Sequence, residues 1–592
     1  MSKIEVATVS LLLKTKMKQA MRYFYNCLTA LLMLCMGSTT LHAIDYTAYS
    51  TENTVGTNYV SADSTIMTYA RPSEYTLLDG SPRFNVLING EAYTGLYDAN
   101  NAWGGNVSFG YFDFKDGTPV EVVISCRKSL GNYHLLPAGA EVSNVEKITD
   151  KILKFTISKA NQNVTLVLDG DYQTGDVLHL FCNDIIKAPN VASKEGYSYD
   201  RKTRTYYFGP GYYDLNDKFG GTLMVAGARS IYLAGGAVVR GTIGLNSTGG
   251  KIYGHGMVVS NGGSELNCSY NTGGVVDGII CHKYKERGWQ TTYSSCSNIK
   301  VTNMKVIAPY GGSSDGMDFT ACSGMQFDNC FVRAMDDCIA IKGLAADSLN
   351  PADCQPEKDI HFTRMQLWSD ANNAFGIGAE TLASSFENIS FTNSDILSSW
   401  DDPSHHEDLN DRAAINITSL HGSFFHNIRI DSIRVNRCVR LIQMGFQDSF
   451  WFGTLLGNMS WEGGMYDIHM SNISSPNDIG SASANDVLLR GWAKKGTPTK
   501  YIHDIWFNNV VIEGSLLDGW NNANLKTNNT DDQKLVYDIH FNETSGIAAS
   551  YPMTPRATAI FPGWYTLQGE RLLQKPIQPG IYIHGGRKTV IH

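Results

Sequence analysis

The sequence predicts an all-β protein: a right-handed parallel β-helix preceded by an N-terminal β-sandwich domain. Three observations predict this fold. One short strand motif recurs eight times from Ser297 to the region of Asn542, the intervals between its copies are unequal, and residues 44–190 contain alternating strand-like runs that lack the motif. With 43% hydrophobic and 11% aromatic residues, the chain has enough apolar side chains to build extended cores.

The recurring motif begins with a residue that is usually Asn or Asp, continues with Ile, and then alternates polar and apolar residues. Its Ile-equivalent positions are 299, 325, 360, 389, 428, 468, 505 and 539. Alternation with a period of two is typical of strands, and Asn and Asp are favoured where a chain turns. One copy cannot bury its own apolar face, so stacked copies must share a core with variable loops between them. A multi-sheet β-sandwich is the alternative, but such a protein seldom repeats one strand motif eight times.

Four segments of the chain differ in pattern. Residues 1–43 are typical of a signal peptide, because lysines and an arginine precede the apolar stretch Leu28–Met36. We expect a β-sandwich domain over 44–190, the parallel β-helix over 191–545, and a linker with a short β-rich tail over 546–592. The tail resembles C-terminal modules of exported proteins from Bacteroidetes-type Gram-negative bacteria. Leader and tail together predict a periplasmic, cell-surface or extracellular protein.

The composition excludes some partners and cofactors. Lys and Arg total 48 against 57 Asp and Glu, for a net charge of -9, and no basic run offers a footprint for nucleic acid or an anionic membrane. Removal of the leader leaves ten cysteines; several lie in apolar strand-like runs, which favours buried free thiols over disulfides. No cysteine and histidine spacing fits a metal site. We therefore expect a monomer with no cofactor, no metal and no membrane span in the mature chain.

Two segments put carboxylates where an apolar core does not need them: SSDGMDF (313–319) and AMDDCIAIKG (334–343). Asp315 precedes Asp336 and Asp337 by 21 and 22 residues, about one short coil, so the segments are expected to stack on neighbouring coils. Carboxylates held close together raise at least one pKa, which yields a protonated acid beside an ionised base. Inverting glycoside hydrolysis needs that division. We assign Asp336 as general acid, with Asp315 and Asp337 holding and deprotonating the water.

The alternative is that these aspartates only cap corners of the β-helix. That purely structural role is expected for four other aspartates of the repeat, Asp359, Asp467, Asp504 and Asp538.

The two acidic segments resemble motifs of the pectinase-type glycoside hydrolases, family 28. SSDGMDF is similar to the N-T-D-G-x-D element of that family, and MDDCIAIKG is similar to its G-D-D-C-I-A-I-K element, in the same order and spacing. The shared region runs from about Gly209 to Asn542. The resemblance implies an inverting β-helix hydrolase that needs no cofactor, with Asp315, Asp336 and Asp337 as its catalytic residues.

The chain departs from family 28 after the acidic pair. The family's histidine is replaced by Asn372 or Asn373, and Ile415 and Ile417 take the places assigned to the Arg and Lys that bind the galacturonate carboxylate. Without those cations a uronic acid loses its counter-charge. A β-sandwich ahead of a β-helix with three aspartates and none of these residues resembles glycoside hydrolase family 49, the dextranase and isopullulanase group. That resemblance implies a neutral α-glucan as substrate.

Four further residues are candidates for substrate binding: Lys342, Asn373, Glu380 and Trp400. Trp400 opens an irregular polar insertion, and the face of an aromatic ring suits a sugar ring. The insertion also contains His405, His406, Glu407 and Asp408, which we interpret as a solvated loop rather than metal ligands. The earlier Gly254-His255-Gly256 precedes the acidic pair and is interpreted as a tight early coil.

Three rival functions remain open at this stage. One is a polygalacturonase-type pectin hydrolase. The second is a polysaccharide lyase, which needs a uronic acid and usually a Lys or Arg base with calcium. The third is a noncatalytic carbohydrate-binding β-helix, which requires no paired aspartates. The fold alone does not decide among them, because β-helices host all of these functions.

Overall fold

The computed structural model describes residues 58–76, 80–260, 262–283, 286–344, 350–400, 412–450, 453–475, 485–542 and four short strands between 564 and 591. The expected signal peptide, residues 1–43, lies outside the described residues, as do His405, His406, Glu407 and Asp408. The chain forms two compact units, residues 1–542 and residues 543–592. Within the described part of the chain, no helix is long and apolar enough to cross a membrane.

The first part of the larger unit is a sandwich of two sheets. The seven strands of one sheet are β1 (Tyr59–Val60), β2 (Ile66–Thr68), β5 (Tyr97–Asn100), β6 (Asn106–Phe114), β8 (His134–Leu136), β11 (Gln162–Val167) and β12 (Asp176–Asp184). The five strands of the other are β3 (Phe84–Ile88), β4 (Glu91–Tyr93), β7 (Val120–Cys126), β9 (Val142–Thr149) and β10 (Ile152–Ile157). Both sheets contribute buried side chains to one core, with Phe84 and Phe155 from one sheet and Phe112 and Leu180 from the other.

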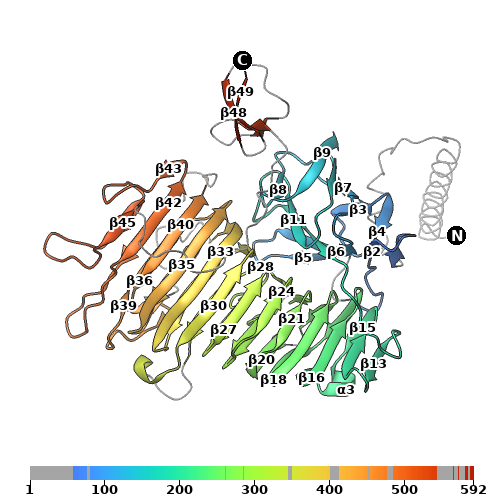
Figure 1. Cartoon of the computed structure of the whole chain (residues 1–592), viewed down its shortest axis with the longest axis horizontal. Helices are drawn as coiled ribbons and strands as arrows, with labels where there is room; N and C mark the ends of the chain where they lie inside the picture. Colours follow the sequence, from blue (N-terminus) through green and yellow to red (C-terminus); the bar gives the residue numbers. More distant parts are fainter. Residues whose placement is uncertain are drawn as a thin grey trace, which may run out of the picture. The chain divides into compact units, whose positions relative to one another are not determined.

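The second part is a parallel β-helix, which Figure 1 shows as a row of neighbouring strands from β13 to β45. Its strands stack in three columns. The first column contains β14 (Thr205–Phe208), β16 (Thr222–Leu233), β18 (Thr242–Gly254), β21 (Val275–Asp277), β24 (Lys300–Thr302), β27 (Ser323–Asp328), β30 (Glu357–Thr363), β33 (Ser385–Ser399), β35 (Phe424–Val435), β40 (Ile468–Ser475), β42 (Ile505–Ile512) and β45 (Ile539–Phe541). The second contains β15 (Gly211–Asp214), β17 (Ala237–Arg240), β19 (Met257–Val259), β22 (Ile280–His282), β25 (Lys305–Ala308), β28 (Phe331–Ala334) and β31 (Gln366–Ser369), and it continues into the end of β33.

The third column begins with the first halves of β16 and β18. It continues with β20 (Leu266–Thr272), β23 (Thr291–Ser294), β26 (Met317–Thr320), β29 (Ile339–Gly343), β32 (Phe375–Thr381), β34 (Ile415–Ser419), β36 (Ile442–Phe446), β41 (Val487–Arg490) and β44 (Leu525–Thr527). Short elements accompany the columns: β13 (Tyr197–Asp200), α3 (Asn216–Phe219), the 3-10 turn Pro351–Asp353, β37 (Ser449–Phe450), β38 (Leu455–Leu456), β39 (Gly464–Met465) and β43 (Ser515–Leu516). The smaller unit is a four-stranded antiparallel sheet of β46 (Trp564–Tyr565), β47 (Arg571–Leu572), β48 (Gly580–His584) and β49 (Arg587–Ile591).

The eight sequence repeats are the last eight strands of the first column, from β24 to β45, which confirms the predicted β-helix. Ile360 pairs with Ile389, Ile389 with Ile428, and Ile428 with Ile468, so the repeated apolar position forms one row inside the core. All of these side chains are buried in a single core cluster that runs the length of the helix. The ten described cysteines are free thiols, and nine of them are buried, including those in the apolar strand-like runs for which the sequence favoured buried free thiols.

The corners of the coils use the residues that tolerate a left-handed backbone. The residue before the repeated Ile has a φ of 55° at Asn298 and Asp359 and 52° at Asp467, and Asp504 and Asp538 adopt the same conformation. A second row of such residues includes Asn303, Asn329, Asn472 and Asn509. Asn and Asp adopt this conformation at lower cost than other residues with a side chain. The predicted corner role of Asp359, Asp467, Asp504 and Asp538 is therefore confirmed.

The sandwich packs on the outer face of the second column. Phe109 and Phe181 of the sandwich share an apolar cluster with Phe331 and Trp368 of the β-helix. Polar contacts cross the same boundary: His255 Nδ1 lies 2.7 Å from Asp113 Oδ2. The Gly254-His255-Gly256 segment therefore belongs to a tight early coil, as predicted, and its histidine faces the sandwich.

Candidate active site

The three aspartates lie at one corner of the β-helix, where the chain enters the third column. Met317 pairs with Ile339 and Ile339 with Phe375 in parallel register. The residues two positions earlier, Asp315, Asp337 and Asn373, therefore occupy equivalent places on three successive coils. Backbone hydrogen bonds join these coils, from Gly316 N–H to Asp337 O (2.8 Å) and from Cys338 N–H to Asn373 O (3.0 Å). The predicted stacking of the two acidic segments is confirmed.

Strand alternation sets the direction of the side chains that follow this corner. Met317 and Phe319 of β26, and Ile339 and Ile341 of β29, lie in the core of the helix. Because successive side chains of a strand point to opposite faces, Asp318 and Lys342 lie on the other face, beside the corner. Sequence reasoning missed Asp318, although a carboxylate between two buried apolar residues is a recognisable signal.

Lys342 is the cation at the centre of the site. Its Nζ lies 2.8 Å from Asp315 Oδ2, 3.2 Å from Asp318 Oδ1 and 3.9 Å from Glu380 Oε1. The ammonium group also lies 4.4 Å from the centre of the Trp289 ring. Lys342, Asp315 and Asp318 are almost fully buried, with 5%, 3% and 1% of their surface exposed. A buried ammonium needs such partners, because desolvation of an unpaired charge is costly.

Asp336 and Asp337 are held by two asparagines of the next coil. Asn372 Nδ2 and the Ser313 N–H (2.9 Å) donate to the carboxylate of Asp336. Asn373 donates to Asp337 Oδ1 twice, from its N–H (3.1 Å) and from its Nδ2 (2.8 Å). Asp336 is partly exposed, whereas Asp315 and Asp337 are buried. Both asparagines that stand where the family 28 histidine was expected therefore contact the catalytic candidates.

The electrostatics of the group follow from its burial. Desolvation raises the pKa of Asp315 to about 6; Lys342 opposes this rise and Asp336 adds to it. Burial, reinforced by the charges of Asp336 and Asp315, raises the pKa of Asp337 well above its usual value. Burial and the neighbouring Asp315 likewise raise the pKa of Asp318. The group therefore holds its protons to a higher pH than ordinary carboxyl groups do, and its members titrate together.

The four residues that the sequence suggested for substrate binding lie in different settings. Lys342 contacts the acids, and the side chain of Asn373 uses its oxygen as well, accepting from Ala413 N–H (2.9 Å) and Asn416 Nδ2 (2.8 Å). Glu380 is partly exposed at the edge of the cluster. Trp400 is 8% exposed, and the Arg437 guanidinium covers one face of its ring at 3.8 Å. Substrate binding by these residues stays a prediction.

The assignment of Ile415 and Ile417 to the positions of the family 28 cations was wrong. Both side chains are buried in the core of the β-helix. Because side chains alternate along the strand, Asn416 and Thr418 lie on the face that carries the aspartates. Asn416 contacts Asn373 on this face. The two positions expected for the cations were therefore assigned one residue away from those that face the site. The residues of β34 that face the site, Asn416 and Thr418, are uncharged.

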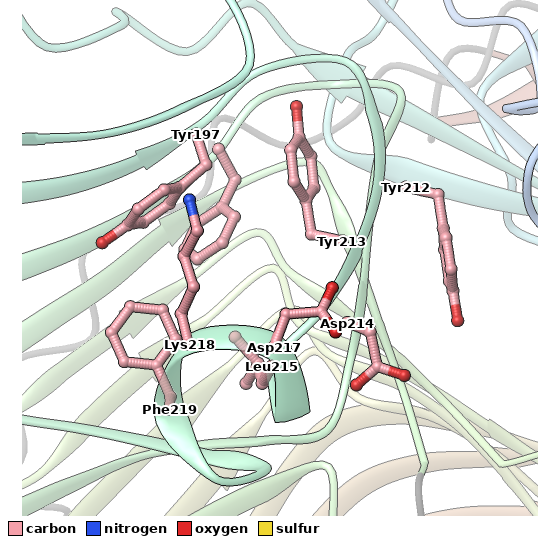
Figure 2. Close-up of a pocket in the computed structure, with 9 residues that line it drawn as sticks. Tyr197, Tyr212, Tyr213, Asp214, Leu215, Asp217, Lys218 and Phe219 are labelled. Carbon is pink, nitrogen blue, oxygen red and sulfur yellow. The ribbon is translucent and has the colours of Figure 1, made fainter.

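A hollow of about 340 Å³ lies away from the aspartates, at the beginning of the β-helix. Figure 2 shows Tyr197 at this hollow beside Lys218 and Phe219 of helix α3. Lys218 Nζ lies 4.5 Å from the centre of the Tyr197 ring. Because none of the catalytic candidates lines it, we do not assign this hollow to the active site. Among the described residues, no group of three or more His, Cys, Asp and Glu side chains is arranged to hold a metal ion.

The raised pKa of Asp337 predicts a pH-dependent effect of its replacement. A carboxyl whose pKa is raised on folding stabilises the fold below its unfolded pKa of about 3.9, and this contribution is lost as pH rises through the folded value. Asp337→Asn removes the ionisation but keeps an acceptor for Asn373. Its Tm relative to the unsubstituted protein should therefore be higher at pH 8 than at pH 4.5 in thermal scans. A Tm difference that is the same at both pH values would contradict the shift.

Comparison with known proteins supports the resemblance found in the sequence. The family model described as glycosyl hydrolases family 28 matches residues 284–358, which contain all three aspartates and Lys342. No curated protein sequence gives a significant match.

Three solved structures have similar chain traces. Dex49A from Penicillium minioluteum is 12% identical with a TM-score of 0.50, over 82% of this chain and 99% of that one. A family 28 exopolygalacturonase of Yersinia enterocolitica is 11% identical with a TM-score of 0.32, over 72% and 97%. A GH87 α-1,3-glucanase from Streptomyces thermodiastaticus is 14% identical with a TM-score of 0.33, over 78% and 84%. The match to the family 28 model and the fold shared with Dex49A together support a resemblance to the pectinase-type β-helix glycoside hydrolases.

Proposed function

We propose that this protein is an exported, inverting glycoside hydrolase that cleaves a neutral polysaccharide, an α-glucan of the kind that dextranase-like enzymes hydrolyse. The observation that carries this proposal is the meeting of Asp315, Asp336 and Asp337 at one corner of two stacked coils. Hydrolysis of a glycosidic bond by inversion requires one protonated carboxyl and one carboxylate that activates water. A purely structural corner would not need three carboxyl groups whose charges act on one another, one of them paired with a buried lysine.

The positions of the three carboxyl groups support a division of roles. Asp336 is the partly exposed member, so it is the one that reaches the leaving oxygen of a bound sugar and serves as general acid. Asp315 and Asp337 lie deeper, on successive coils, and hold the water that attacks from the other side of the ring. The raised pKa values of the buried Asp315 and Asp337 keep a proton within the group, and this proton is the one that the mechanism requires.

The surroundings of the acids favour a neutral substrate. Lys342 is already paired with Asp315 and Asp318, which leaves its charge unavailable to the carboxylate of a uronic acid. On β34, the residues that face the site are Asn416 and Thr418, which are uncharged. Recognition of a carboxylate normally uses an arginine or lysine that donates directly to it.

A polygalacturonase-type pectin hydrolase is the second candidate. The match of the family 28 model to the segment with the aspartates favours it. The pairing of Lys342 with two carboxylates weighs against it, and it weighs equally against a lyase that would use this lysine as base. A noncatalytic carbohydrate-binding protein would not need the buried carboxyl groups of Asp315, Asp318 and Asp337.

The remaining features of the proposal come from the sequence. The leader 1–43 directs export to the periplasm, cell surface or outside of a Bacteroidetes-type bacterium, and the mature protein acts as a monomer without cofactor. The β-helix over 191–545 carries the activity, behind the sandwich domain over 44–190 and ahead of the tail over 546–592.

The first test concerns the charge of the substrate. Because no free cation faces the acids on β26, β29 or β34 in the described structure, hydrolysis of dextran or pullulan should be far faster than hydrolysis of polygalacturonate. The protein is incubated with a panel of polysaccharides. Hydrolysis is measured from new reducing ends, and lyase activity from the absorbance of unsaturated products. Efficient cleavage of polygalacturonate would favour the pectin hydrolase, and unsaturated products would favour the lyase.

The second test concerns stereochemistry. Direct attack of water held by a carboxylate inverts the anomeric centre in one step. Proton NMR of the first product formed should therefore show the anomer opposite to the linkage of the substrate. Retention of configuration is incompatible with the roles assigned here.

The third test concerns the trio itself. Asp315→Asn, Asp336→Asn and Asp337→Asn preserve side-chain size, so the proteins should fold, while turnover should fall by roughly 10² to 10⁴-fold. Asp336→Asn should lose much less activity on an aryl glycoside with a good leaving group, since such a substrate needs little help from an acid. Asp467→Asn, at a structural corner with a φ of 52°, is the matched control and should keep full activity. If the variants of Asp315, Asp336 and Asp337 kept near-normal turnover, these three residues would have a structural role and not a catalytic one.

A further inference from the structure

One turn of the sandwich contacts the chain just before the Asp315 loop and just before Asn372 and Asn373, the donors to Asp336 and Asp337. This turn, residues 101–105, joins β5 to β6 and is called here the Trp103 turn. Trp103 Nε1–H donates to Asp370 O at 2.8 Å, and Ala102 N–H donates to Pro309 O at 3.1 Å. Pro309 precedes the loop with Ser313 and Asp315, and Asp370 precedes Asn372 and Asn373. The turn therefore contacts the chain shortly before Ser313, Asn372 and Asn373, the residues that donate hydrogen bonds to Asp336 and Asp337.

The contact with Asp370 reaches the acid pair through a short turn of the β-helix. Ser369 Oγ donates to Asp336 O (3.0 Å) and accepts from Asn372 N–H (2.8 Å). Asn372 and Asn373 then donate to Asp336 and Asp337. A displacement of Asp370 would thus shift both amide donors together.

The Asp370 turn is anchored on its other side by a buried ion pair. Arg333 donates to the Asp370 carboxylate from Nε (3.0 Å) and from Nη2 (2.9 Å), and Trp368 Nε1 donates to it at 3.0 Å. Arg333 is fully buried, and His179 of sandwich strand β12 lies 3.1 Å from its Nη1. The sandwich therefore contacts the Asp370 turn both at its backbone, through Trp103, and behind its carboxylate, through His179.

The Trp103 turn is internally fixed, so it provides a firm support. Asn101 Oδ1 accepts the N–H groups of Trp103 (3.1 Å) and Gly105 (2.7 Å), and Asn101 Nδ2 donates to Gln173 O (2.7 Å). Gly105 also has no room for a side chain: a Cβ there would lie 2.0 Å from Gln173 O. These contacts hold the loop against the rest of the sandwich.

We propose that the Trp103 turn is a positioning element of the active site, which fixes the Asp315 loop and the Asn372–Asn373 turn relative to one another. The proposal rests on the proposed function, because it assigns the sandwich a part in the geometry of that reaction. A shift of about 1 Å in a catalytic constellation can cost roughly 10²-fold in rate. The turn restrains two loops that come from different coils. The reaction needs this restraint because the carboxyl groups held by these loops must keep fixed positions around one substrate.

The alternative interpretation is that the Trp103 turn only helps to attach the sandwich to the β-helix. The apolar boundary between Phe109, Phe181, Phe331 and Trp368 already provides that attachment. Loss of one hydrogen bond from this boundary should therefore leave the sandwich in place, while it removes the restraint that Trp103 puts on the backbone carbonyl of Asp370.

The test is Trp103→Phe, which removes the donor to Asp370 O and keeps an aromatic ring at a partly exposed position. On the best neutral polysaccharide, kcat should fall by at least about tenfold, while KM stays within about twofold and Tm within about 2 °C. Hydrogen exchange measured by mass spectrometry should become faster in residues 309–315 and 369–373. Ala102→Pro, which deletes the donor to Pro309 O, is the second variant if the first is too unstable to purify.

The matched control is Asn329→Gly. It removes the hydrogen bond from Asn329 Nδ2 to Asn161 O (2.8 Å), another contact between the β-helix and the sandwich, at a position whose φ of 55° suits glycine. This variant should keep kcat and the exchange rates of both segments. An unchanged kcat in Trp103→Phe, a rise in KM alone, or an equal loss in Asn329→Gly would overturn the proposal.

The exchange measurement separates this proposal from the proposed function. If the unsubstituted protein hydrolyses no polysaccharide, the proposed function fails. Faster exchange of both segments in Trp103→Phe, without a change in Asn329→Gly, would still identify the turn as their restraint. Unchanged exchange would reject the restraint whatever the activity.

Discussion

The parallel register of the third column is the constraint on which the candidate site depends. Each strand of that column hydrogen-bonds to the next, so Asp315, Asp337 and Asn373, far apart in sequence, become neighbours on consecutive coils. Alternate apolar residues such as Met317 and Ile339 fix this register, because they fill the core. A slip of one residue would turn the aspartates away from their place and expose apolar side chains instead.

The chemistry of the site follows from the number of charges that this register brings together. Four carboxyl groups, Asp315, Asp318, Asp337 and Glu380, interact with one ammonium group, that of Lys342, and Asp336 adds its charge beside Asp315 and Asp337. The lysine lowers the energy of the nearest carboxylate but cannot neutralise them all. Burial then keeps protons on the group at a pH where free carboxylates are ionised, which is the condition that acid and base catalysis by carboxyl groups needs.

The sandwich and the β-helix are linked by more than their shared apolar boundary. The sandwich covers the second column, and the corner that follows the second column is the one that carries the aspartates. A domain packed there is adjacent to the loops that hold the acids. Buried pairs such as Arg333 with Asp370 at the same boundary orient a turn of the active site as well as joining two layers.

The sequence by itself determined the repeat, the fold class, the stacking of the two acidic segments and the aspartate trio. Local signals carry this information: period-two alternation, Asn and Asp at left-handed corners such as Asp359, and carboxylates next to apolar strands. Only the tertiary structure decided which residues face the site. Ile415 and Ile417 were misplaced because alternation gives two possible faces, and only packing of the coils selects one. Partners such as Asp318 with Lys342, or Trp103 with Asp370, were beyond prediction, since their contacts join residues 24 and 267 positions apart through packing that no local pattern records.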